Sequence, residues 1–182
     1  MVNNQIEFNN KYFDKEIIKE IKIEDEYDFE GQLFVADYLN LEKLYLHDVD
    51  RIEKITLKNL PQLQECTIWD CGVKELVISN CPNIETLNVR RNNLTSLEFL
   101  VNLRNLTEQD KLDIEGNPKL DEILKPYGGD WKKWKALIHS EGSSYYIQSR
   151  IQKHEEKVES ETSLKKESEL KTQIEIPPKG GN

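Results

Sequence analysis

The sequence predicts a repeat solenoid of the α/β class that is rich in strands, and three observations support this fold class. A hydrophobic pattern recurs every ten or eleven residues through the middle of the 182-residue chain. Within each unit, apolar residues stand two apart with polar residues between them, as in a short half-buried strand. Turn-forming residues follow many of the units. Such a fixed period is typical of a stacked coil, in which each unit buries its apolar face against its neighbours.

Six repeat units form the body of the chain. Their central apolar positions follow one another at intervals of 11, 11, 10, 11 and 10 residues. These positions are Leu44, Ile55, Cys66, Leu76, Leu87 and Leu97. Two less regular units precede them, around Ile21 and over 29–35, as expected at the end of a repeat array. Turns are expected at 59–61, 80–82 and 116–118, because proline donates no ladder hydrogen bond and asparagine bonds to nearby backbone.

Helical segments are expected after the last of these six units. Leucines at helical spacing predict a short helix over 100–106, and Leu112-x-Ile114 then restores one strand unit. A further helical turn is predicted over 120–124. Asp130 is an expected N-cap for a final helix. One face of that helix carries Trp131, Trp134, Leu137 and Ile138. We expect the segments over about 119–138 to cover the end of the core as short C-terminal capping helices.

The composition divides the chain into three parts. Residues 1–16 form an N-terminal lead-in, and 17–138 form the repeat domain with its C-terminal cap. The tail over 139–182 is rich in Glu, Lys and Ser and has few bulky apolar residues, which hold no constant heptad spacing. We expect this tail to be largely disordered or transiently helical, because it cannot bury enough apolar surface to offset its ordering entropy.

Two units carry a recognisable motif. One runs Ile84-xx-Leu87-x-Val89-xx-Asn92-x-Leu94, and the other runs Leu63-xx-Cys66-x-Ile68-xx-Cys71-x-Val73. The first matches the pattern LxxLxLxx(N/C)xL at every defining position, and the second matches it with Cys71 at the Asn/Cys site. The chain therefore resembles a leucine-rich repeat protein over roughly 17–125, and its alternating ten- and eleven-residue half-modules resemble the nested type. Val49 and Leu60 depart from the motif at Asn/Cys sites, so different turns are expected there.

The resemblance implies a right-handed coil with a parallel β-sheet on its concave face, where such proteins usually bind other proteins. The period alone also fits another kind of β-solenoid. If alternate modules face the concave side, strand alternation turns one set of side chains outward. That candidate patch consists of Tyr45, His47, Trp69, Asn88 and Arg90. Exposed Trp, Tyr and Arg supply much of the energy at protein interfaces. The alternative is that Tyr45 and Trp69 only stack against neighbours on an unused sheet face.

Charge and hydropathy restrict the partners and the compartment. The net charge is −9, of which about −8 precedes residue 139. An acidic body disfavours nucleic acid and anionic membranes as partners. No apolar run is long enough to cross a bilayer, the start lacks the features of a signal peptide, and the cysteine count is odd. We therefore expect a cytoplasmic monomer that binds another protein.

Catalytic and metal-binding arrangements are sparse. Cys66 takes a buried position of the repeat, and Cys71 and Cys81 take turn positions, so no structural zinc site is expected. His47 with Asp48 could form an acid/base pair or a ligand cluster, but an Asp-rich turn is the more ordinary explanation. The phosphate-binding and hydrolase motifs are absent from the sequence. We expect neither catalysis nor a cofactor.

Three functions remain open from the sequence. The first is a non-catalytic protein–protein interaction module that binds through the concave face. The second is the substrate-recognition or regulatory subunit of a signalling or ubiquitin-transfer complex, with catalysis supplied by a partner. The third is a structural or surface-adhesive repeat protein, which the expected lack of an export signal disfavours.

Overall fold

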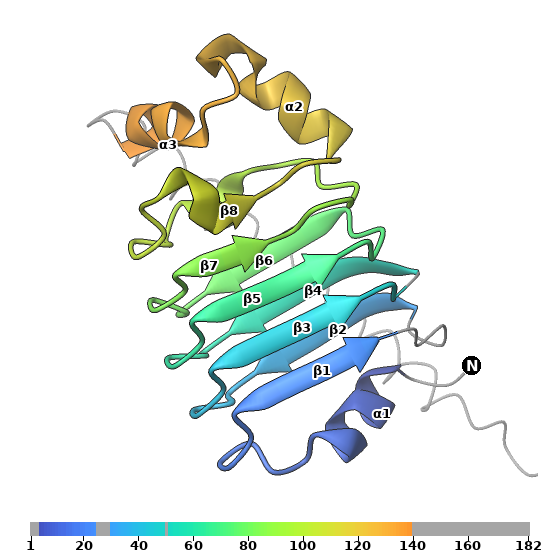
Figure 1. The fold of residues 1–182 in the computed structure, drawn as a ribbon. Helices are drawn as coiled ribbons and strands as arrows, with labels where there is room; N and C mark the ends of the chain where they lie inside the picture. Colours follow the sequence, from blue (N-terminus) through green and yellow to red (C-terminus); the bar gives the residue numbers. More distant parts are fainter. Residues whose placement is uncertain (1–3, 25–29, 50, 140–182) are drawn as a thin grey trace, which may run out of the picture. The chain divides into compact units, whose positions relative to one another are not determined.

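The fold is a β-solenoid of about four turns built from parallel strands (Figure 1). The computed structural model describes residues 4–24, 30–49 and 51–139. Nearly all of the tail that the sequence predicts to be disordered lies outside these ranges. Contacts divide the chain into one compact unit over 1–135 and another over 136–182, and the architecture below is that of the first unit.

Two parallel sheets make up the solenoid. The five-stranded sheet contains, in spatial order, β1 (Glu20–Glu24), β3 (Lys43–His47), β5 (Glu65–Trp69), β7 (Thr86–Asn88) and β8 (Leu112–Asp113). The three-stranded sheet contains β2 (Gly31–Ala36), β4 (Ile52–Lys58) and β6 (Glu75–Ser79). From β1 to β7, successive strands of the chain alternate between the sheets, so both half-modules form strands there, whereas β7 and β8 both belong to the five-stranded sheet. The second sheet adds to the one parallel sheet that the resemblance implies.

Strand alternation sets the core. In β3, Leu44 and Leu46 are buried, whereas Lys43, Tyr45 and His47 point to the other side and remain partly or fully accessible. The other strands repeat this pattern with Leu, Ile, Val or Cys at the buried positions. The two sheets lie one behind the other (Figure 1), and these apolar side chains are buried. Each coil therefore buries its apolar residues against the coils before and after it.

The turns between strands repeat with the coils. Left-handed backbone follows the strands of the three-stranded sheet at Asp37, Asn59 and Asn80, and it follows those of the five-stranded sheet at Asp48, Asp70, Arg91 and Gly116. Asp, Asn and Gly tolerate this conformation better than other residues. The Asn59 amide donates to the Asp37 carboxylate at 2.8 Å, and the Asn80 amide donates to Asn59 at 2.9 Å. The turn residues thus bond to their equivalents one coil away.

Two buried asparagines form hydrogen bonds with backbone groups at the turns of the last coils. Asn92 accepts from the backbone N–H groups of Cys71 and Val73 and donates to three carbonyl groups. Asn117 accepts from the Leu94 N–H at 3.1 Å and donates to two carbonyl groups. Both occupy the Asn/Cys site of the motif. A buried amide at this site satisfies backbone groups that the turn would otherwise leave unpaired.

The N-terminal lead-in contains α1 (Asn4–Lys11) and covers the outer edge of the first coil. The Gln5 side chain both accepts from the Phe34 N–H at 2.7 Å and donates to the Phe34 carbonyl at 2.8 Å. The Tyr12 hydroxyl donates to the Lys22 carbonyl at 2.6 Å. Side chains therefore form hydrogen bonds with backbone groups of β1 and β2 that are not paired with another described strand. Unpaired strand edges promote association, and this contact blocks part of both.

The segment between β7 and β8 departs from the expected pattern. The unit around Leu97 forms no strand, and the helix expected over 100–106 is only the 3₁₀ turn η1 (Glu98–Leu100), followed by turns. Leu100, Leu103 and Leu106 are nevertheless buried. The leucine spacing correctly marked a face that packs on the core. It overestimated the regularity of the backbone, since the segment forms only short turns, in which the Leu100 N–H donates to the Leu97 carbonyl at 3.0 Å and the Leu103 N–H to the Leu100 carbonyl at 3.2 Å. A second 3₁₀ turn, η2 (Gln109–Lys111), leads into β8.

Helices follow β8, as expected. They are α2 (Pro118–Leu124), the 3₁₀ turn η3 (Lys125–Tyr127) and α3 (Trp131–His139). The predicted N-cap of α3 is confirmed, because the Asp130 carboxylate accepts from the Lys132 and Lys133 N–H groups at 2.9 and 3.3 Å. Trp131 and Trp134 are buried, but Leu137 is 56% exposed, so its expected place on the same buried face was wrong.

Candidate protein-binding surface

The predicted patch lies on the outward face of the five-stranded sheet. Backbone register aligns two outward rows across the strands. One row is Lys22, Tyr45, Thr67, Asn88 and Asp113, and the other begins with Glu24, His47 and Trp69. The repeat spacing had predicted these neighbours, because positions one full coil apart meet in a parallel sheet. All five residues of the patch are half-buried.

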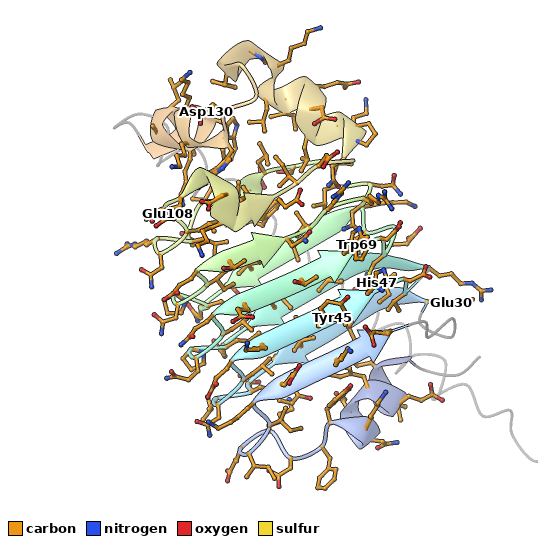
Figure 2. The ribbon with its side chains drawn as sticks, in the orientation of Figure 1. Glu30, Tyr45, His47, Trp69, Glu108 and Asp130 are labelled. Atoms are coloured by element: carbon orange, nitrogen blue, oxygen red, sulfur yellow. The ribbon has the colours of Figure 1, made fainter. Side chains whose placement is uncertain are left out.

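Aromatic rings meet at the centre of the patch (Figure 2). The His47 and Trp69 rings stack with their centroids 4.2 Å apart and an interplanar angle of 15°. The Tyr45 ring lies 6.2 Å from His47 in a tilted arrangement. We name Tyr45, His47, Trp69, Asn88 and Arg90 the outer-sheet patch. Its three rings give a broad apolar area on a sheet face that otherwise carries polar side chains.

Trp69 is packed more tightly than the sequence indicated. His47 stacks on its ring, and the Arg91 guanidinium carbon lies 5.9 Å from the ring centroid. The indole Nε1 is buried and has no hydrogen-bond partner among the described residues. Sequence reasoning treated this tryptophan as free of packing requirements, but stacking with neighbours holds it in place. Its orientation is therefore fixed before any partner arrives, which lowers the entropy lost on binding.

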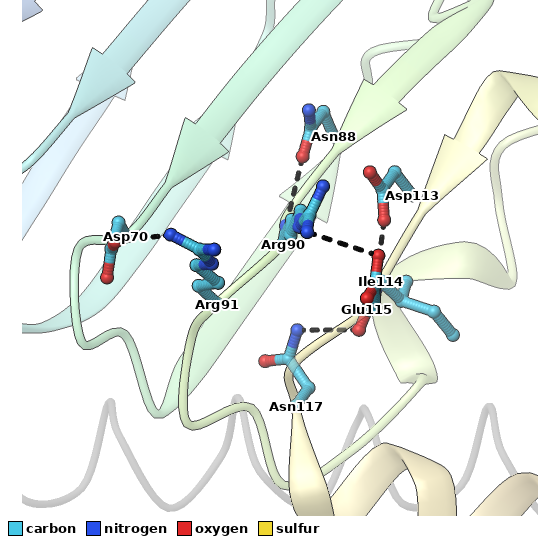
Figure 3. Close-up of polar contacts among 8 residues, drawn as sticks. All are labelled: Asp70, Asn88, Arg90, Arg91, Asp113, Ile114, Glu115 and Asn117. Atoms are coloured by element: carbon cyan, nitrogen blue, oxygen red, sulfur yellow. Dashed lines mark hydrogen bonds and ion pairs between the residues drawn. The ribbon is translucent and has the colours of Figure 1, made fainter.

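Arg90 and Arg91 both form polar contacts with carboxylates near the ends of these strands (Figure 3). The Arg90 guanidinium lies 3.4 Å from the Glu115 carboxylate. The backbone N–H of Arg90 donates to the Asn88 side chain at 3.0 Å. Arg91 faces Asp70 at 3.6 Å. Arg91 is a contact that the sequence reasoning missed, because it stands in the left-handed turn just beyond the alternating strand positions. Asp48 and Asp70 occupy the equivalent turn positions of earlier coils. This equivalence was the sequence signal that could have placed Arg91 beside Asp70.

Charges on the rest of this face are largely balanced. Lys22 pairs with Glu24 at 2.8 Å, and Lys43 pairs with Glu65 at 2.9 Å. The Lys22 ammonium also lies 5.5 Å from the Tyr45 ring centroid. Exposed pairs of this kind add little to stability. Around a half-buried aromatic centre, however, they form the polar rim that protein interfaces commonly have.

The other candidate chemistry has ordinary structural explanations. The three thiols are buried, and those of Cys71 and Cys81 donate to carbonyl groups two residues earlier. Burial raises the pKa of the Cys66 thiol and of the Cys81 thiol, which disfavours the thiolate. Asp48 is a left-handed turn residue whose N–H donates to the Trp69 carbonyl, as the turn interpretation expected. Among the residues described, no group of three or more His, Cys, Asp and Glu side chains is placed to hold a metal ion.

A pocket beside β8 was not predicted. Its volume is about 740 Å³. One wall is formed by residues 112–115, and the other by parts of α2 and η3 together with Gly128 and Gly129. Asp113 and Glu115 belong to the outward rows of the five-stranded sheet, so the pocket adjoins the outer-sheet patch. No sequence pattern predicts this pocket, because the path that the chain takes after β8 determines how its two walls face each other.

None of the helices in the described part of the chain has the length and apolar character required to cross a bilayer. Comparisons of the chain with protein-family models, with curated proteins and with solved structures find no significant match. The arrangement of its own residues is therefore the basis for assigning a function.

Proposed function

We propose that this protein is a non-catalytic interaction module that binds another protein through the outer-sheet patch. The observation that carries the proposal is the half-buried aromatic cluster of Tyr45, His47 and Trp69, with the His47 and Trp69 rings 4.2 Å apart. Aromatic and Arg side chains dominate the binding energy of protein interfaces. A parallel sheet also holds such residues on a rigid surface, which suits recognition.

The proposal extends to the kind of solenoid. We propose a right-handed coil of the nested leucine-rich repeat type, with the five-stranded sheet on the concave side and α2 and α3 as C-terminal caps. The buried Asn92 and Asn117 support this assignment, because they sit at the motif's Asn/Cys site and bond to turn backbone. The burial of Leu120, Leu124 and Trp131 supports the capping role.

A quantitative capture experiment tests the binding surface. Full-length protein, Trp69→Ala and Arg90→Ala are immobilised, and captured proteins are compared by mass spectrometry. Lys58→Ala is the matched control, because Lys58 lies at the exposed end of β4 in the other sheet. Affinity for any protein captured specifically is then measured with each variant in solution. We expect Trp69→Ala to weaken binding by more than about 1 kcal/mol and Lys58→Ala to leave it unchanged.

Two results would contradict the proposal. One is unchanged binding of every specific partner by Trp69→Ala. The other is an equal loss with Lys58→Ala, which would place the interface elsewhere. Circular dichroism of each variant separates loss of binding from loss of fold.

A further inference from the structure

β8 is the last strand of the five-stranded sheet, and among the described residues no strand pairs with its outer edge. The Val89 N–H donates to the Asp113 carbonyl at 2.8 Å, and the Arg91 N–H donates to the Glu115 carbonyl at 2.8 Å. These carbonyl groups therefore point toward β7. Backbone groups of successive strand residues point in opposite directions, so the Leu112 carbonyl and the Ile114 N–H point away from β7. No residue in the described ranges forms a hydrogen bond with either of them.

The other sheet edges are partly covered by described residues. At the N-terminal end, Gln5 bonds to both backbone groups of Phe34 in β2, and Tyr12 bonds to the Lys22 carbonyl in β1. The last strand of the three-stranded sheet, β6, packs beside η1. Exposed strand edges are commonly blocked, since they readily pair with another chain. β8 differs in that a pocket lies between 112–115 and the described segments that follow the strand.

This pocket has an apolar base and acidic walls. Leu112, Ile114 and Leu124 contribute apolar surface to its lining. Gly128 and Gly129 contribute no side chains to the far wall, and an added Cβ at either would meet no atom within 4 Å. The pocket therefore offers room beside a strand edge, together with an apolar surface on which side chains could pack.

Negative charge predominates around the same pocket. Its lining includes the carboxylates of Asp113, Glu115, Asp121 and Glu122, against one lysine, Lys125. Arg90 partly balances Glu115, and Lys119 balances Glu122 at 3.1 Å. Asp121 forms no ion pair with the described part of the chain. A ligand with positive charge would complement these walls, and a negatively charged one would be repelled.

We infer that β8 and its pocket bind an extended, lysine- or arginine-rich segment of the protein partner, which adds a strand to this outer edge. The inference rests on the proposed function, because it assigns one segment of that same partner. Main-chain hydrogen bonds to Leu112 and Ile114 supply affinity, as in other cases of strand addition. Basic side chains lay their aliphatic stems on the apolar base and reach the carboxylates with their charged ends. The Arg90–Glu115 contact joins this site to the outer-sheet patch.

Fluorescence anisotropy with defined peptides tests the inference on the full-length protein. The probes are labelled peptides of equal length in which valine alternates with lysine or with glutamate. A third probe is the lysine peptide with an N-methyl group on every backbone nitrogen, which removes the hydrogen-bond donors from both edges of the peptide. We expect the lysine peptide to bind at least about tenfold more tightly than the other two. Equal affinities, or no binding of any probe, would overturn the inference.

Matched variants separate the pocket from general charge attraction. Asp113→Asn/Asp121→Asn removes two pocket carboxylates, and Glu7→Gln/Glu98→Gln removes two exposed carboxylates elsewhere. We expect the pocket variant to weaken the lysine peptide about five- to tenfold and the control variant less than about twofold. Equal losses would mean that the peptide responds to overall charge, and the inference would fail.

The two proposals fail in different ways. If Trp69→Ala abolishes capture of a partner and the pocket variant leaves that capture unchanged, the outer-sheet patch remains the binding surface and the β8 site is wrong. If the lysine peptide depends on the pocket carboxylates while Trp69→Ala changes no partner, the β8 site remains and the proposed role of the patch is wrong.

Discussion

Asn92 shows how one buried polar side chain stabilises a turn of this solenoid. It is 2% exposed, and its amide accepts from the Cys71 and Val73 N–H groups at 3.2 and 3.1 Å. Alanine at this position would leave both donors buried and unpaired, at about 1–3 kcal/mol each. We therefore expect Asn92→Ala to lower the free energy of unfolding by about 2–5 kcal/mol in urea denaturation. The exposed neighbour Asn93→Ala is the control, and an equal small loss in both variants would contradict this role.

Tyr38 gives the fold a dependence on alkaline pH. Its side chain is fully buried, its hydroxyl donates to the Tyr12 carbonyl at 2.9 Å, and burial raises the pKa of Tyr38 to about 12. The unfolded pKa is about 10, so the fold favours the neutral phenol. This contribution is complete below about pH 10 and is lost as the pH rises through about 12.

The measurement is urea denaturation of wild type and Tyr38→Phe between about pH 9 and pH 12. Phenylalanine cannot ionise, so the wild type should lose about 2–3 kcal/mol more than the variant over this range. Parallel pH profiles for the two proteins would show that Tyr38 ionises as easily in the folded state as in the unfolded state.

Sequence reasoning succeeded at positions that the period determines. Leu44, Cys66 and Leu87 are buried, and Tyr45 lies beside Thr67, because equivalent residues of successive coils occupy equivalent places. It failed where contacts cross that period. The stacking of His47 and Arg91 around Trp69 depends on side-chain orientation, which hydrophobic spacing does not specify.

The C-terminal helix α3 contributes to stability through a buried residue that the repeat period does not identify. Trp131 is 2% exposed, although the sequence could assign it only to an amphipathic helix. Truncation of a buried Trp leaves a large cavity, so we expect Trp131→Ala to cost about 3–5 kcal/mol by thermal or urea unfolding. Leu137→Ala, at an exposed position of the same helix, should cost less than about 1 kcal/mol. Similar losses for both would mean that α3 does not depend on its tryptophan face.

The first helix illustrates what local patterns cannot provide. Residues 1–16 are polar, and the sequence supports only a lead-in with some helix. In the structure, α1 places Gln5 against Phe34, a residue 29 positions later. A single polar side chain that replaces two strand hydrogen bonds has no periodic signature. The strand edge explains its presence, since unpaired backbone groups need partners and open edges favour association.

The same limit applies beyond β7. Leucines over 94–106 continue an apolar pattern, yet the structure there has turns and η1 in place of a strand. Burial of these leucines was predictable, because this part of the solenoid interior is filled by apolar side chains. The backbone conformation was not, since this segment lies beside β6, the last strand of the three-stranded sheet, yet packs there as η1 and turns instead of pairing as a further strand.

Stacking of coils determines how the repeat domain as a whole responds to damage. Each strand pairs only with strands one coil away, so stability is a sum of terms within coils and between neighbours. Leu33 in β2 and Leu57 in β4 are both fully or almost fully buried in the same sheet. Leu33 belongs to the terminal coil and has a strand on one side only, whereas Leu57 lies between two neighbouring coils. The same truncation should therefore destabilise different parts of the solenoid at the two positions.

Hydrogen–deuterium exchange of the full chain, read by peptide mass spectrometry, measures this difference. Each Leu→Ala change should cost about 2–5 kcal/mol locally. Leu33→Ala should accelerate exchange in α1 and β2 while β5 and β6 keep their protection, because opening the terminal coil breaks one interface. Leu57→Ala should lower protection on both sides of β4, because its coil joins the first coil to the rest. If both variants accelerate exchange uniformly from β1 to β8, the coils open as a single cooperative unit, and the nearest-neighbour description of this solenoid is wrong.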